Sequence, residues 1–273
     1  MSRPRLTMAT CMSPNMAGAA EALASWLSQH TRLQVEFVRH GSWQSRQAAF
    51  DRAELDLLWI CGLPYVERAD RSAGDIVPLA APVMLAERYR RQPVYYSEVL
   101  VPNQSEVRSL ADLPGTTWGY NEPGSHSGYG VMAAHLARSG LDWQYFGQVV
   151  ETGSHLASMA ALRRGEIEAS AVDSTVWETA LRAEPGLFGT LRSILTLGPS
   201  PAPPLITRRV IADAYGDMIL QALAAMPTEE AGRRILAGDG LGFWAPVEDR
   251  DYDPIRQMAA EAARLQPPWQ VPA

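Results

Sequence analysis

Lysine is absent from this chain of 273 residues, and all 24 of its basic residues are arginine. Without a lysine amine the protein cannot form a Schiff base with a substrate or use a lysine nucleophile. It also lacks the lysine with which phosphate-loop proteins hold a nucleotide. A function that involves an anion must therefore rely on arginine, histidine, hydroxyl groups or backbone N–H groups.

Cysteine is scarce, with Cys11 and Cys61 as the two representatives. Two cysteines are too few for a disulfide scaffold or for a metal site made of cysteines alone. The five histidines include no H-E-x-x-H pattern, so the sequence predicts neither a metal nor another cofactor. Both cysteines end strands that we expect to be neighbours. We interpret them as small buried apolar residues, and an approach to each other or to a ligand is the alternative.

An excess of positive charge and long apolar runs are also missing. The formal net charge of −6 gives no reason to expect nucleic acid as a partner. No apolar run approaches the length of a membrane-spanning helix. Residues 1–10 carry basic side chains but not the apolar core of a signal peptide, so two compartments stay open. We expect the protein in the periplasm if a leader was removed, and in the cytoplasm otherwise. We also expect the protein to be a monomer.

What the sequence does contain is a regular alternation of strand and helix patterns. In the first part it predicts strands at 6–11, 33–38, 55–61 and 76–80, and helices at 16–30, 42–52 and 63–69. This rhythm is typical of a parallel sheet covered by helices. Ligands bind such sheets at the edge formed by the carboxyl ends of the strands. Cys11, residues 41–43 and residues 61–62 fall at that edge.

A second series of the same kind follows a strand at 94–102. It predicts strands at 116–120, 145–150, 168–172 and 190–197, and helices at 126–139, 154–163 and 175–183. Helices at 210–225, 229–236 and 254–265 then complete the chain, with the last as a brace. The proline-dense stretch 198–204 is interpreted as a return crossing between the two series.

These patterns predict an α/β fold of two Rossmann-like lobes joined by a two-segment hinge, near 88–95 and 198–206, with a cleft between them. The first lobe comprises 1–90 and 205–273, and the second comprises 91–204. A single continuous doubly wound sheet and a small enzyme with a cap domain are the alternatives.

The stretch from Asn121 to Gly130, N-E-P-G-S-H-S-G-Y-G, joins a strand pattern to a helix pattern. Pro123 and Gly124 interrupt the strand, and Ser125 stands where the helix would begin. A helix start leaves backbone N–H groups without partners and carries partial positive charge, so it binds an anion without lysine or arginine. An ordinary turn with a serine cap explains the same residues, and both interpretations stay open here.

Short segments follow one another in a recognisable order over nearly the whole chain. They are L-D-L-L-W-I-C-G at 55–62, Y-Y-S at 95–97, S-L-A-D-L-P-G at 109–115, P-G-S-H-S-G-Y at 123–129, T-G-S-H at 152–155, G-E-I-E-A-S-A-V-D-S at 165–174, G-F-W-A-P at 242–246 and P-I-R-Q-M at 254–258. The ordered set resembles the phosphate/phosphite/phosphonate-binding proteins of ABC transporters, which have the type II periplasmic binding-protein fold.

This resemblance implies a receptor without catalytic residues that closes around a small oxyanion. The ligand-binding residues that it implies are Ser125, His126, Ser127 and Tyr129 at the first turn, His155 and Asp173 at the next two strand ends, and Trp43 and Tyr95 from the first lobe and the hinge. The chain departs from the family at two of them. Trp43 stands where a smaller aromatic residue is common, and His126 replaces a hydroxyl residue.

The chemistry of these residues suits an oxyanion, because hydroxyl and amide groups donate to its oxygens. An ionised Asp173 only accepts hydrogen bonds, so it favours a protonated ligand oxygen or a ligand ammonium group. Trp43 and Tyr95 offer an apolar wall to a P–H or P–C group. Ordinary structural roles are the alternatives: a cap or surface position for His155 and a helix cap for Asp173, and a core or rim position for the aromatics. Tyr96 is the alternative to Tyr95.

The sequence therefore predicts a solute-binding protein that captures a phosphate-type oxyanion or a small organophosphonate in an interdomain cleft. Uptake would proceed through an ABC transporter, whose permease would be its protein partner. Two alternatives on the same fold stay open. One is a cytoplasmic enzyme that resembles a pyrimidine-precursor synthase, which the absence of lysine disfavours. The other is a cytoplasmic ligand sensor.

Overall fold

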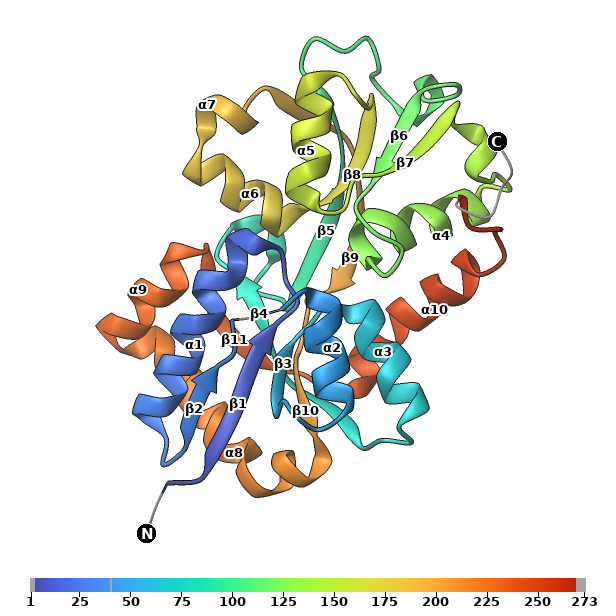
Figure 1. Cartoon of the computed structure of the whole chain (residues 1–273). Helices are drawn as coiled ribbons and strands as arrows, with labels where there is room; N and C mark the ends of the chain where they lie inside the picture. Colours follow the sequence, from blue (N-terminus) through green and yellow to red (C-terminus); the bar gives the residue numbers. More distant parts are fainter. Residues whose placement is uncertain (1–2, 40, 269–273) are drawn as a thin grey trace. The chain divides into compact units, whose positions relative to one another are not determined.

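The structure is a computed structural model that describes residues 3–39 and 41–268. Its fold divides into two compact units, each of which contains one mixed sheet with helices (Figure 1). The first unit consists of Met1–Val94 and Pro201–Asp253, and the second of Tyr95–Ser200 and Pro254–Ala273. The chain therefore passes between the units three times.

The first unit is built on a six-stranded sheet with the order β11-β4-β10-β3-β1-β2. Its strands are β1 (Arg5–Thr10), β2 (Gln34–Phe37), β3 (Leu57–Trp59), β4 (Ile76–Met84), β10 (Leu205–Arg208) and β11 (Leu241–Pro246). Its helices are α1 (Ala17–His30), α2 (Trp43–Asp51), α3 (Gly62–Arg71), α8 (Arg209–Ala225) and α9 (Glu230–Gly238). Strand β1 pairs in parallel with both β2 and β3, as the β-α-β rhythm predicts.

The sheet of the first unit is not parallel throughout, which corrects the prediction. Strand β10 runs antiparallel between β3 and β4, and β11 runs antiparallel to β4. The expected crossing at 198–204 is shorter than predicted, because strand β9 extends to Pro201 and β10 begins at Leu205. Strand β10 has four residues beside a proline-rich stretch, so it has too little sequence to show an alternating pattern.

The first unit has an apolar core that tryptophans anchor. Leu57, Leu58 and Trp59 of β3 are all buried, since that strand lies in the middle of the sheet. The indole N–H of Trp59 donates to Pro203 O at 3.0 Å, and that of Trp26 on α1 donates to Ala222 O at 2.7 Å. Trp26 and Trp59 therefore each satisfy the indole donor while the apolar ring contributes to the core.

The second unit is built on a five-stranded sheet with the order β7-β6-β8-β5-β9. Its strands are β5 (Val94–Pro102), β6 (Thr117–Tyr120), β7 (Gln148–Glu151), β8 (Ala169–Asp173) and β9 (Leu191–Pro201). Its helices are α4 (Val131–Arg138), α5 (His155–Arg164), α6 (Ser174–Ala183), α7 (Pro185–Phe188) and α10 (Asp253–Ala262). Strand β6 is parallel to β7 and β8, whereas β5 is antiparallel to β8.

The carboxyl ends of β6, β7 and β8 lie along one edge of this sheet because these strands are parallel neighbours. Each of them leads into a helix that begins at this edge: α4, α5 and α6 (Figure 1). A turn of π-helix, η4 (His126–Gly130), precedes α4, so the segment predicted as one helix from 126 starts with a wider turn. Three helix starts therefore converge on one edge of the second unit.

Helix α10 packs within the second unit, although we expected residues 205–273 to lie in the first lobe. Met258 of α10 is buried against Val131 and Ala134 of α4. Arg138 at the end of α4 donates to Glu261 at 2.6 Å. The amphipathic pattern of α10 predicts an apolar side but not the surface against which that side packs. The sequence therefore could not show that α10 belongs to the second unit.

Candidate functional site

The turn after β6 begins the candidate site. Ser125 is the cap residue of η4, and its Oγ accepts a hydrogen bond from the backbone N–H of Gly128 at 3.1 Å. Its carbonyl oxygen accepts from the N–H of Gly130 at 3.0 Å. Because the Ser125 hydroxyl accepts this bond, its own proton stays free to be donated. Pro123 and Gly124 precede this turn, as the sequence predicts.

Gly128 allows three parts of the site to approach closely. A Cβ at this position would overlap Asn121 Oδ1 and would lie 3.1 Å from Cε1 of His155. Asn121 follows β6, whereas His155 begins α5. The absence of a side chain at residue 128 thus brings the end of β6, the η4 turn and the start of α5 together.

The first two helix starts are joined by a direct contact. Ser127 Oγ lies 2.9 Å from Nε2 of His155, and both side chains are buried. His155 is the first residue of α5, whose cap residue Ser154 accepts from the N–H of Ala157 at 3.1 Å. Nδ1 of His155 is buried without a hydrogen-bond partner in the described part of the chain. Burial lowers the pKa of His155 to about 4, so the ring is neutral at neutral pH.

The third helix start carries Asp173, the last residue of β8 and the cap of α6. Its Oδ1 accepts from the backbone N–H of Thr175 at 2.8 Å and from the Thr175 hydroxyl at 2.7 Å. Burial raises the pKa of Asp173 to about 6, although the bonds from Thr175 oppose the shift. Among the described residues no cation contributes to this pKa, so an ionised Asp173 would be stabilised by a ligand that brings a donor proton or a positive charge.

His126 lies between the two serines in sequence, but its ring contacts other residues. Nε2 of His126 lies 3.1 Å from Ser200 Oγ on β9, and its ring stands edge-on to Tyr95 of β5 at 6.5 Å. His126, Ser200 and Tyr95 are each at most 1% exposed. Burial lowers the pKa of His126 to about 3, so this ring is neutral too.

Tyr129 also packs into the unit. Its ring stacks on Trp143 with a centroid distance of 5.1 Å, and it lies at a tilt to Tyr120 at 5.6 Å. These rings belong to the apolar cluster beneath α4. Burial raises the pKa of the Tyr129 hydroxyl above its ordinary value.

Trp43, the remaining predicted site residue, belongs to the first unit. It is the first residue of α2 and is half-buried. Ser42 caps this helix by accepting from the N–H of Ser45 at 3.2 Å. The thiol of Cys11, at the end of β1, donates to Trp43 O at 3.5 Å. The predicted sheet edge thus does bring residues 11 and 43 together. Both cysteines are thiols and half-buried.

Three polar residues near this edge of the second unit were not among the predicted binding residues. Ser97 on β5 stands opposite Asp173, and its buried hydroxyl has no hydrogen-bond partner among the described residues. The same holds for Oδ1 of Asn121. Glu122 follows, and burial together with the charge of Glu151 raises its pKa to about 7. Ser97 was detectable, because it shares a strand face with Tyr95 two residues earlier.

The arrangement provides hydroxyls, neutral imidazoles and helix starts, and its acidic residues are partly or readily protonated. Such a set binds an anion through hydrogen bonds and helix dipoles. In the described residues, no group of three or more histidine, cysteine or acidic side chains is placed to hold a metal ion. No helix among these residues is both long and apolar enough to cross a bilayer.

The fold places the protein in a known structural class. It is similar to a crystal structure of the binding protein component of an ABC phosphonate transporter from Pseudomonas aeruginosa, with a TM-score of 0.82, 20% identity, and coverage of 96% of this chain and 87% of that one. It is also similar to PhnD1 from Prochlorococcus marinus in complex with methylphosphonate, with a TM-score of 0.83, 16% identity, and coverage of 96% and 99%. The fold is that of the type II periplasmic binding proteins.

The sequence itself matches a family profile over residues 7–252. The chain belongs to the family of periplasmic substrate-binding proteins of phosphonate ABC transporters. A curated relative, the probable ABC transporter phosphite binding protein PhnD1 of Prochlorococcus marinus, is 23% identical over 161 residues. That match covers 58% of this chain and spans about half, 54%, of the relative's length.

Proposed function

We propose that this protein captures a small phosphorus oxyanion or organophosphonate for uptake by an ABC transporter. The contact between Ser127 and His155 is the observation that carries the proposal, since it places the starts of η4 and α5 side by side. Two neighbouring helix starts present several N–H donors and partial positive charge to one ligand. Family membership supports the same ligand class.

The proposed binding groups differ in role. The Ser125 and Ser127 hydroxyls donate to the phosphoryl oxygens. In this arrangement Nε2 of His155 donates to Ser127 Oγ, so Nδ1 carries no proton and accepts from a protonated ligand oxygen. His126 contributes its main-chain N–H, because its ring is held by Ser200 and Tyr95. We include Asp173, whose carboxylate accepts from a protonated ligand oxygen or from an ammonium group of the ligand. The aromatic walls are Tyr129 and Tyr95, and Trp43 adds a contact from the first unit.

The rest of the proposal follows the family. The members of this family are substrate-binding proteins, which favours a receptor over the enzyme or the ligand sensor considered above. We propose that the protein works as a monomer in the periplasm and delivers its ligand to a transporter permease. Size-exclusion chromatography with light scattering tests the monomer, and cell fractionation tests the compartment.

Titration calorimetry tests the ligand class with phosphate, phosphite, methylphosphonate and 2-aminoethylphosphonate. At least one of these should bind, and Ser127→Ala should weaken it by about tenfold to a hundredfold, because a hydrogen bond to a charged group contributes about 1.5–3 kcal/mol. Ser139→Ala, an exposed position at the end of α4, is the matched control and should bind as the wild type does. Failure of all four ligands would overturn the proposal.

A further inference from the structure

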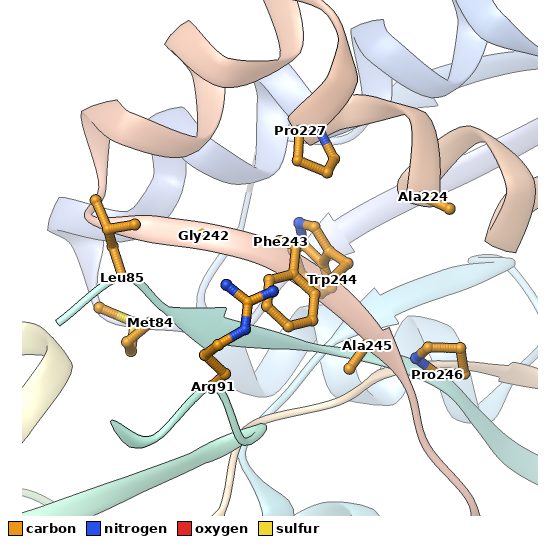
Figure 2. Close-up of a pocket in the computed structure, with 10 residues that line it drawn as sticks. All are labelled: Met84, Leu85, Arg91, Ala224, Pro227, Gly242, Phe243, Trp244, Ala245 and Pro246. Carbon is orange, nitrogen blue, oxygen red and sulfur yellow. The ribbon is translucent and has the colours of Figure 1, made fainter. Parts of the chain in front are cut away.

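The first unit contains a hollow that the proposed function does not use. It has a volume of about 410 Å³ and lies where β4 and β11 meet the end of α8. Its walls are apolar apart from a single arginine, as Figure 2 shows. They consist of Met84, Leu85, Arg91, Ala224, Pro227, Gly242, Phe243, Trp244, Ala245 and Pro246. This volume is in the range of small-molecule sites, which are mostly apolar and have few polar groups.

Arg91 supplies the polar group of this hollow. Its guanidinium lies over the ring of Phe243, with 5.2 Å from Cζ to the ring centroid (Figure 2). No acidic side chain in the described part of the chain pairs with Arg91, whereas many other arginines of this acidic protein are paired. A guanidinium that lies over a ring face can still use its N–H groups for a bidentate contact with a carboxylate.

The backbone conformation at Arg90 and Arg91 also supports a functional role for the position of the Arg91 side chain. Arg90 and Arg91 have φ angles of 50° and 56°, so two successive arginines adopt the left-handed conformation that favours glycine. Such conformations persist where the surroundings enforce them, and they concentrate at binding sites. Leu85 lies on the wall of the same hollow and is 70% exposed. This is the highest exposure of any large hydrophobic side chain among the described residues.

We propose that this hollow binds a small amphipathic carboxylate, with Arg91 holding the carboxylate and the apolar walls covering its hydrocarbon part. The charge of Arg91 requires an anion, and a planar carboxylate matches the fork of the guanidinium. The surrounding Leu85, Phe243 and Trp244 require an apolar body on that anion. The lining of this hollow shares no residue with the proposed phosphorus-oxyanion site.

Ligand-observed NMR on the full chain tests the site with three probes. Hexanoate carries both the charge and the hydrocarbon tail, hexanamide carries the tail alone, and acetate carries the charge alone. We expect hexanoate to bind at least about tenfold more tightly than either of the others, because a charge-assisted bond and apolar burial each contribute. Saturating methylphosphonate should leave hexanoate binding unchanged, and displacement would overturn the assignment to this hollow.

Two variants and a matched control complete the test. Arg91→Gln should weaken hexanoate about tenfold and leave hexanamide unchanged. Arg90→Gln removes the same charge from the same strained turn but does not line the hollow, so it should bind hexanoate as the wild type does. Ala224→Phe fills the hollow and should abolish binding of both tailed probes. Equal binding of hexanoate by wild type and Arg91→Gln, or of hexanoate and hexanamide by the wild type, would overturn the proposal.

Discussion

Two buried histidines give the candidate site its unusual character at the scale of single residues. His126 and His155 have their pKa lowered by burial to about 3 and about 4, so both rings are neutral dipoles over the physiological range. A neutral imidazole is a donor at one nitrogen and an acceptor at the other. The contact with Ser127 couples the two groups: when Nε2 of His155 donates to Ser127 Oγ, the serine proton stays free for the ligand and Nδ1 is an acceptor.

The same residues predict how stability depends on pH. As the pH falls below 6.5, the unfolded chain protonates its histidines, whereas the folded chain does so only near pH 4 or 3. Each buried histidine should therefore remove about 1.4 kcal/mol of unfolding free energy per pH unit in this interval. Asp173 opposes them: its pKa is raised from 3.8 to about 6, so it costs stability as the pH rises through that range.

Urea denaturation of the wild type, His126→Asn and Asp173→Asn between pH 4 and 7 measures these contributions. In the wild type the two histidines, which lose stability on acidification, are opposed by Asp173 and by Glu122, whose pKa is raised to about 7, so the informative quantity is the difference between each variant and the wild type. The His126→Asn protein should lose less, and the Asp173→Asn protein should lose more. A wild-type and a His126→Asn curve of the same slope would contradict the assignment of His126 as a buried neutral group.

Turn η4 determines the site at the scale of an element. Its residue Gly128 packs so closely that a Cβ would overlap Asn121 Oδ1 and press on His155. Gly128→Ala should therefore destabilise the protein by about 1–3 kcal/mol and abolish ligand binding, because overpacking forces the turn and the start of α5 apart. Gly124→Ala is the matched control four residues earlier, where a Cβ would meet nothing within 4 Å.

Thermal unfolding and titration calorimetry of the two glycine variants provide the measurement. The Gly124→Ala protein should keep the wild-type melting temperature and affinity. If Gly128→Ala behaved in the same way, the close approach of the three segments would not be what forms the site.

Most elements were predictable from the sequence, and the misses have a physical reason. Residues 43–51 and 155–164 form helices whose caps, Ser42 and Ser154, carry an explicit local signal. Strand β10 was missed because its direction and its place between β3 and β4 depend on long-range pairing. The serine turn was identified in the sequence, but the orientation of the His126 ring towards Ser200 was not, since Ser200 is remote in sequence.

At the scale of the whole molecule, both units have the same architecture, a mixed sheet with helices, but they are built from different segments of the chain. Each has a mixed sheet in which three parallel strands form one side, β3-β1-β2 in the first unit and β7-β6-β8 in the second. Each unit is assembled from separated parts of the chain. The second unit contains three helix starts at one edge together with α10 from the chain's last part. Assignment of α10 to this unit rests on Met258 and on the ion pair between Arg138 and Glu261.

Met258→Ala tests that assignment. Removing this buried side chain should cost about 2–5 kcal/mol and should increase hydrogen exchange in α4, which it covers. Amides of α8 in the first unit should exchange as in the wild type. Gln257→Ala, at the exposed neighbouring position, controls for a change in helix propensity. Faster exchange in α8 with an unchanged α4 would instead place the last helix with the first unit.

The insertion of β10 between β3 and β4 has a consequence for synthesis on the ribosome. Three of the six strands of the first unit's sheet are affected. Strand β4 cannot join β3 in the nascent chain until residues 205–208 have emerged, because it reaches β3 only through β10, and β11 at 241–246 follows later still. The five strands of the second unit are complete by Pro201, before that happens. The sheet of the unit that begins the polypeptide is therefore completed later than the sheet of the second unit. More than a hundred codons are translated between β3 and β10, and during that time one edge of β3 has no strand partner.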